Sequence, residues 1–132
     1  MKAKELRIGN LVQVNGVEYK IHSIHSPEPM KDENFSNKFY VRLWNNGLTS
    51  CLLSDLEPVP LTREKLFMFG FEDISNDVES VFIKGNFCFY GSLNEVVVEL
   101  DDGETEYDLF TECKFAHKLQ NLWLDLTEEE LL

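Results

Sequence analysis

The sequence predicts an α+β protein: an SH3-like small β-barrel N-terminal module, followed by an antiparallel sheet flanked by two helices. Three observations lead to this prediction. Short apolar or alternating runs are separated by Asn-Gly, Gly-Asn and Asp-Gly pairs, which favour tight hairpins. Two other segments carry the caps and spacing of helices. The charge balance also changes abruptly between residues 1–61 and 62–132, so we expect two modules packed as one unit.

The first hairpin is predicted for residues 11–24. Asn15-Gly16 suits the two positive φ angles of a type I′ turn. A two-residue turn here places Val12 opposite Tyr19 on an apolar face.

A second hairpin is predicted for residues 39–44 and 48–53, around Asn46-Gly47, after a surface loop over 26–38. A short closing strand over 57–61 would complete a barrel, although a plain four-stranded meander fits the same pattern. A two-residue turn defines two faces: Val41 and Leu43 with Leu48, Ser50 and Leu52, and Tyr40, Arg42 and Trp44 with Thr49, Cys51 and Leu53.

A short helix is predicted directly after the prolines at 58 and 60. Proline disfavours helical geometry in the residue before it, so the helix begins at Thr62, whose hydroxyl is a good N-cap. Gly70 provides a left-handed ending. We expect Leu66 to face the core between the two modules. The alternative, an amphipathic helix for a membrane or partner, is weaker because the polar face is only one turn long.

Two acidic hairpins are predicted in the second half, over residues 78–90 and 95–109. Gly85-Asn86 and Asp102-Gly103 are their turn signals. The second turn would place Glu99 opposite Glu106 and Asp101 opposite Glu104 on the outer face.

A final helix is predicted from its apolar stripe, with Thr111 as the expected N-cap. Thr127 and Glu130 have the spacing of a capping box for one further turn. The stripe consists of Phe115, Leu119, Leu122, Trp123 and Leu126.

Composition indicates a folded cytoplasmic protein. Hydrophobic residues make up 43% of 132, yet no apolar run approaches the roughly 20 residues that a membrane-spanning helix needs. Residues 1–57 hold seven acids and seven Lys or Arg, so residues 58–132 carry the whole net charge of −12. This charge argues against nucleic-acid or anionic-membrane binding by the second half. The cysteines at 51, 88 and 113 are expected to be reduced and buried.

No motif predicts catalysis, a cofactor or a metal site. His22 and His25 would lie on opposite faces of one strand, which disfavours a shared metal ion. His117 follows Cys113 at helical spacing, but nothing supplies an orienting carboxylate, so we expect a surface histidine and no enzyme.

Two surfaces are candidates for partner binding. The first is the acidic run Glu99, Asp101, Asp102, Glu104, Glu106 and Asp108, which is either a solubilising face or a docking face for a cationic protein. The second is the aromatic and cationic strand face of Tyr40, Arg42 and Trp44, which could stack a base or hold a peptide. We expect this second face to be buried instead, because large aromatic side chains are seldom exposed.

The sequence resembles an uncharacterised family of short proteins found in gut Bacteroidales genomes, prophages and mobile elements. The resemblance rests on the Glu5–Val12 segment, on Leu56–Thr62 with Phe69–Phe71, and on His117–Trp123 with Leu126–Leu131. Lys65 departs from the family, which often has a Trp there. The family has no assigned activity, so the resemblance implies only an accessory or host-interaction role.

These observations favour a non-enzymatic interaction module of phage or mobile-element origin that docks a cationic protein through its acidic sheet face. A nucleic-acid-associated accessory protein that uses the N-terminal barrel is the alternative.

Overall fold

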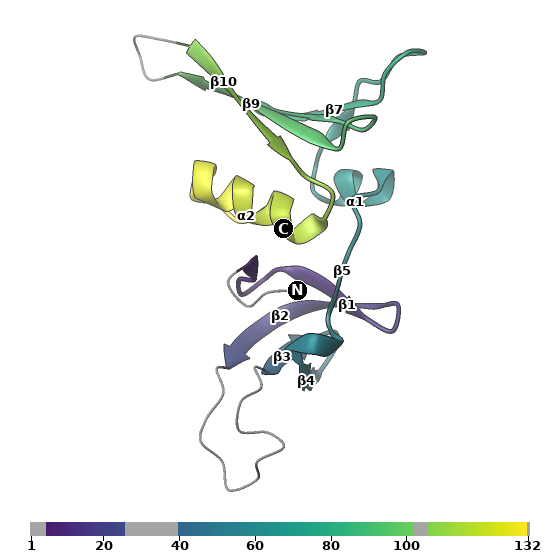
Figure 1. Cartoon of the computed structure of the whole chain (residues 1–132), viewed down its shortest axis with the longest axis vertical. Helices are drawn as coiled ribbons and strands as arrows, with labels where there is room; N and C mark the ends of the chain where they lie inside the picture. The colour runs from purple at the N-terminus through teal and green to yellow at the C-terminus, as the bar shows by residue number, and fades with distance from the viewer. Residues whose placement is uncertain (1–4, 26–39, 102–105, 132) are drawn as a thin grey trace, which may run out of the picture. The chain divides into compact units, whose positions relative to one another are not determined.

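The computed structural model of the protein describes residues 5–25, 40–101 and 106–131 (Figure 1). The chain forms two five-stranded antiparallel sheets and two short helices, so it is mostly β. It divides into two compact units. The first unit comprises Met1–Val59 and Phe115–Glu129, and the second comprises Pro60–Lys114 and Glu130–Leu132.

The first unit contains a sheet with the strand order β4-β3-β2-β1-β5. Within the described strands, β4 and β5 are the two edges, so no closed barrel is formed. A 3₁₀ turn, η2 (Leu53–Asp55), leads from β4 into β5, which returns antiparallel to β1. The strands are β1 (Leu11–Val14), β2 (Val17–His25), β3 (Tyr40–Trp44), β4 (Leu48–Leu52) and β5 (Glu57–Pro58). The core of this unit is Leu6, Val12, Ile21, Val41, Leu43 and Leu56.

The first hairpin confirms the sequence prediction. Val12 lies opposite Tyr19, and the turn residues Asn15 and Gly16 have φ angles of 51° and 78°. Both angles lie in the left-handed region that a type I′ turn requires.

The predicted register of the second hairpin is wrong by one residue. Trp44 pairs with Leu48, so the connection is three residues long, with Asn46 in the left-handed region at φ 53°. A shift of one residue exchanges the faces of a strand. Val41 and Leu43 therefore face Cys51 and Thr49, whereas Tyr40, Arg42 and Trp44 share their face with Leu52, Ser50 and Leu48. The predicted loop over 26–38 lies outside the described residues.

The last helix, α2 (Ala116–Thr127), belongs to the first unit and packs against β1. A polar network joins it to the segment before β1. The Gln120 side chain is 7% exposed, and its oxygen accepts a hydrogen bond from the Leu11 N–H at 2.8 Å. Its amide nitrogen donates to the Gly9 carbonyl at 3.2 Å. One side chain thus satisfies two backbone groups that β1 and α2 would otherwise bury unpaired.

Two further pairs extend this network along α2. Asn121 accepts a hydrogen bond from the Asn10 amide at 2.8 Å and donates to the Glu5 carbonyl at 2.8 Å. Arg7 binds the Asp125 carboxylate with both terminal nitrogens, at 2.6 and 3.1 Å. The hydrogen bond and charge of Arg7 lower the pKa of Asp125. The segment from Glu5 to Leu11 is therefore fixed by polar contacts as well as by burial of Leu6.

Two predictions about the ends of α2 are wrong. The helix begins after Phe115, which makes no side-chain cap, because Thr111 still belongs to a strand and pairs with Val96. The predicted capping box at Thr127 and Glu130 does not start a new turn. Instead, the Thr127 hydroxyl donates to the Trp123 carbonyl at 2.7 Å.

The second unit contains a sheet with the strand order β10-β9-β8-β7-β6. Its strands are β6 (Glu72–Asp73), β7 (Val81–Lys84), β8 (Phe87–Tyr90), β9 (Glu95–Asp101) and β10 (Glu106–Glu112). The Gly85-Asn86 turn is confirmed, with Gly85 at φ 57° and Lys84 opposite Phe87. The two-residue strand β6 was not predicted.

The predicted caps of the short helix α1 (Arg63–Met68) are confirmed. The Thr62 hydroxyl accepts the Lys65 N–H at 3.3 Å. At the other end Gly70 has φ 89°, and the Phe71 N–H reaches back to the Leu66 carbonyl at 2.9 Å. This is a Schellman ending. Leu66, whose carbonyl accepts one of its hydrogen bonds, has a side chain that is 1% exposed.

The predicted register of the acidic hairpin is wrong by two residues. Glu99 lies opposite Asp108 instead of Glu106, and Asp101 lies opposite Glu106. A shift of two keeps every side chain on its predicted face, because strand side chains alternate with a period of two. The remaining two predicted acids of this region, Asp102 and Glu104, lie outside the described residues.

Candidate functional site

The face of the second sheet that carries the acids also carries a row of apolar side chains. Ile83, Cys88, Val97 and Phe110 lie opposite one another across β7, β8, β9 and β10, and we call them the apolar row. The first three are half-buried, whereas Phe110 is 62% exposed. The other face of the sheet carries its buried side chains: Phe82, Phe87, Phe89, Val96 and Val98. The apolar row therefore lies on the more open face.

Acidic cross-strand pairs flank the apolar row on both sides. Glu95 lies opposite Glu112 on one side, and Glu99 lies opposite Asp108 on the other. We call these four residues the acidic rows. Carboxylates opposite one another on a sheet repel, so these pairs do not stabilise the sheet. Lys114 contacts Glu112 at 3.0 Å.

Negative charge on this face also affects Tyr90, which lies beside Cys88 and Glu95. Its pKa is raised, first by a hydrogen bond with the Cys88 side chain, and then by the charge of that thiol, by burial, and by Glu79 and Glu99. The negative charge beside the apolar row comes from the carboxylates of the acidic rows.

The face of the first sheet that carries Tyr40, Arg42 and Trp44 is exposed, so the expectation that it is buried is wrong. Trp44 is 51% exposed, and its neighbour Leu48 is 54% exposed. Tyr40 stacks on His25, with ring centroids 4.4 Å apart and planes 2° apart. The core side of β3 belongs to Val41 and Leu43 instead, which are fully buried, so the general rarity of exposed aromatic side chains did not hold here.

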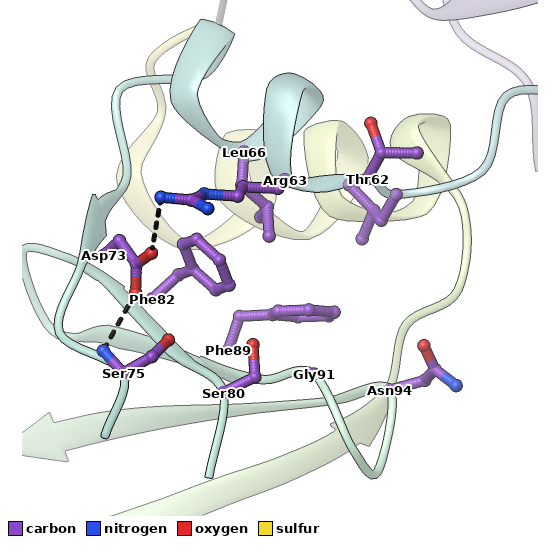
Figure 2. Close-up of a pocket in the computed structure, with 11 residues that line it drawn as sticks. Thr62, Arg63, Leu66, Asp73, Ser75, Ser80, Phe82, Phe89, Gly91 and Asn94 are labelled. Atoms are coloured by element: carbon purple, nitrogen blue, oxygen red, sulfur yellow. Dashed lines mark hydrogen bonds and ion pairs between the residues drawn. The ribbon is translucent and has the colours of Figure 1, made fainter. Parts of the chain in front are cut away.

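A cleft of about 360 Å³ lies within the second unit, beside α1 (Figure 2). Its apolar lining includes Leu66, Phe82 and Phe89, each at most 4% exposed. Its polar lining comes from α1 and its N-cap, from β6 and from the loops that join the strands, and consists of Thr62, Arg63, Asp73, Ser75, Ser80 and Asn94. No sequence motif predicted this cleft.

An ion pair lies at one side of the cleft. Arg63 Nη2 is 3.3 Å from Asp73 Oδ2 (Figure 2). The guanidinium also lies 5.2 Å from the Phe67 ring centroid. Asp73 Oδ1 accepts the Ser75 N–H at 2.9 Å. Hydrogen bonds from Ser75 and the charge of Arg63 lower the pKa of Asp73, so its carboxylate stays ionised. The cleft thus offers one positive and one negative group side by side.

The cysteines and histidines form no catalytic arrangement in the described residues. Cys113 is buried, but Cys51 and Cys88 are half-buried, so their predicted burial is only partial. Burial, followed by the charge of Asp55, raises the pKa of Cys51, which disfavours a reactive thiolate. Because α2 begins at Ala116, Cys113 does not lie on the helix that carries His117. Within the described chain, no group of three or more His, Cys, Asp or Glu could hold a metal ion.

His117 is buried rather than on the surface. It is 2% exposed, and its two ring nitrogens have no hydrogen-bond partner among the residues that the structure describes. It stacks on Phe115 at a centroid distance of 6.1 Å. Burial lowers its pKa, as does the nearby Lys118, while Glu5 acts in the opposite direction. The neutral ring is therefore the form that fits the fold.

We expect the free energy of unfolding to decrease as the pH falls below about 6.5, the value at which an unfolded-state histidine titrates. The folded-state pKa is lowered, so the unfolded chain binds this proton more readily and acid favours unfolding. Urea titrations between pH 7 and 5 measure the slope, and His117→Leu should flatten it. Asp73 and Asp125 do not interfere in this range, because their pKa values are lowered. An unchanged slope in His117→Leu would contradict the assignment.

No family model matches the chain, and no curated protein or solved structure shows significant similarity to it. None of the helices in the described part of the chain is long and apolar enough to cross a membrane.

Proposed function

We propose that this protein is a non-enzymatic interaction module that docks a cationic segment of another protein on the open face of its second sheet. The observation that supports this best is the apolar row lying between two acidic rows. Repulsion between Glu99 and Asp108 is unfavourable in the free protein, and a positively charged partner would relieve it.

The chemistry of the face defines the partner. Phe110 offers exposed apolar area, which supplies affinity when a partner covers it. The acids on either side would pair with Lys or Arg and would accelerate association. The segment that fits carries apolar side chains with basic residues on both sides of them. Such a segment differs from a purely basic one, which the acids alone would attract.

The test is a titration of the isotope-labelled protein with a short extended peptide in which Lys, Val and Lys occupy every second position, so that all three share one side, followed by NMR. We expect shifts in the amide signals of β8, β9 and β10, with affinity that falls as salt is added. Phe110→Ser should weaken binding about fivefold or more, because a central exposed aromatic contributes over 1 kcal/mol in typical interfaces. Glu99→Gln with Asp108→Asn should weaken binding at low salt and reduce its salt dependence.

The matched control is Glu64→Gln with Asp77→Asn, which removes the same charge from exposed positions on α1 and on a loop. It should leave the affinity nearly unchanged. Equal losses in both double variants would mean that only the net charge attracts the peptide. Binding that is insensitive to Phe110→Ser would contradict a role for the apolar row.

Nucleic-acid binding by the first unit is a second candidate, supported by the exposure of Trp44 next to Arg42. Its sheet, in which β5 follows a 3₁₀ turn and returns to β1, supports an SH3-like architecture. A single-stranded oligothymidylate in the same titration distinguishes the candidates. Shifts confined to β3 and β4 would favour nucleic acid, and shifts on β8 to β10 with the peptide alone would favour the protein partner.

A further inference from the structure

We infer that β4, an edge strand of the first sheet, pairs antiparallel with β4 of a second copy of this chain, so that two sheets join edge to edge. This inference does not depend on the proposed function, which uses the second sheet. Among the described strands, β4 pairs only with β3. An edge strand has backbone N–H and C=O groups on its outer side that no neighbouring strand binds, so it can accept a further strand.

β4 differs from the other three sheet edges of the described chain, because it lacks the features that usually prevent such pairing. Natural edge strands are kept apart by shortness, by charged side chains or by proline. β5 and β6 are each only two residues long, and β10 carries Glu106, Asp108 and Glu112. β4 has five residues, with the sequence Leu-Thr-Ser-Cys-Leu, and the first three are exposed. It therefore has length and access without charge or proline.

The sequence of β4 is complementary to itself. A two-fold axis at Ser50 places this residue opposite its own counterpart. Leu48 then lies opposite Leu52 of the second copy, and Thr49 lies opposite Cys51 of the second copy. Apolar side chains thus meet apolar ones, and the contact covers part of Leu48, which is 54% exposed in the single chain. A register displaced by one residue would instead join the open face of one copy to the core face of the other.

Charge favours a second copy as the occupant of this edge. A symmetric contact places every charge near the axis opposite a like charge, and β4 has no charge to repel its counterpart. Arg42 pairs with Ser50, so the two copies of Arg42 would be three strand spacings apart, about 14 Å. This exceeds the screening length of about 8 Å at physiological ionic strength. The net charge of residues 1–57 is zero, so the two sheets do not repel each other through their net charge.

Sedimentation equilibrium of the full chain, from about 10 μM to about 1 mM, tests the pairing. We expect the mass to rise toward twice that of one chain, with a dissociation constant on the order of 0.1 mM, because the contact is small. Ser50→Lys should weaken dimerisation at least tenfold, since two like charges then lie opposite each other at the axis. The matched control is Ser92→Lys, which adds the same charge at an exposed position between β8 and β9 and should leave the dimer unchanged.

Cross-linking tests the register. Opposite Cα atoms of antiparallel strands are about 4.5–5.5 Å apart, a separation that a disulfide can span. Mild oxidation should therefore link two Ser50→Cys chains, whereas wild type and the Arg42→Cys control, one strand further in, should stay unlinked. A wild-type chain that remains a monomer at about 1 mM would overturn the proposal, as would a dimer that tolerates Ser50→Lys. Linkage of wild type through Cys51 would overturn the axis at Ser50, because Cys51 would then face its own counterpart.

Discussion

Leu66→Ala is expected to lower the free energy of unfolding of the second unit by about 2–5 kcal/mol. Leu66 is 1% exposed on α1, and its side chain fills the space beside the sheet at the base of the cleft. Removing its branched end leaves a cavity in the core of the second unit. Denaturant titration, with a probe in each unit, measures the loss.

The matched control is Met68→Ala on the same helix. Met68 is 41% exposed, so its truncation should cost well under half as much. A loss below about 1 kcal/mol for Leu66→Ala would show that α1 is peripheral to the core of the second unit. Such a result would also weaken the case for a pre-formed cleft.

Gln120→Leu is expected to destabilise the first unit by roughly 2–5 kcal/mol. The substitution keeps the apolar bulk but leaves the Leu11 N–H and the Gly9 carbonyl without their partner. An unpaired buried polar group costs roughly 1–3 kcal/mol, which applies in full to the buried Leu11 N–H and in part to the half-buried Gly9 carbonyl. Because the two sites share one side chain, the effect should appear in a single unfolding transition.

Lys118→Gln, at an exposed position two residues earlier on α2, is the control and should change stability by less than about 0.5 kcal/mol. If Gln120→Leu costs as little as Lys118→Gln, then water or a rearranged backbone satisfies Leu11 and Gly9. The network would then be a consequence of the packing of α2 and not a cause of it.

The accuracy of the predicted hairpins depended on loop length. Asn15-Gly16 and Gly85-Asn86 form two-residue turns, and their registers were predicted correctly. The Asn46-Gly47 pair lies in a three-residue connection, because Asn45 is also unpaired between β3 and β4. A dipeptide with a preference for positive φ cannot distinguish these lengths, and a difference of one residue exchanged the two faces of β4 relative to β3.

The apolar spacing of α2 correctly predicted a helix, but it did not predict where the helix begins or that His117 is buried. The period of the apolar residues shows which of them share one side of the helix. It does not show where the helix begins, because threonine is equally suited to a helix cap and to a strand, and Thr111 lies in β10. The burial of His117 also had no sequence signal, because histidine is common on surfaces. The sequence predicted a surface histidine here, whereas its neighbour one turn on, Asn121, makes polar contacts with Asn10 and Glu5.

The candidate sites differed in how well the sequence predicted them. The acidic rows followed from alternation alone, so a register error of two residues left Glu99 and Asp108 on their face. The apolar row required the pairing of four strands, and the cleft required loops far apart in sequence, such as those that hold Asp73 and Asn94. Neither could be assembled from local patterns.

Two hydrogen bonds that hold the first unit together join segments far apart in the sequence. Asn10 and Leu11, near one end of the sequence, bond to Asn121 and Gln120, near the other. The sheet faces proposed here for binding lie between these contacts in the sequence.

The division of the first unit into two separated stretches has a consequence for the order of folding. On the ribosome, the whole second sheet emerges before α2, so this sheet can form while the first unit still lacks its last helix. The Leu61 N–H and the Lys114 carbonyl, 2.9 Å apart, then hold the two ends of residues 60–114 together. This shortens the loop that must close when Gln120 meets Leu11, 109 residues earlier in the chain, and so reduces the entropic cost of that closure. The inserted unit would thus guide the docking of α2 during synthesis.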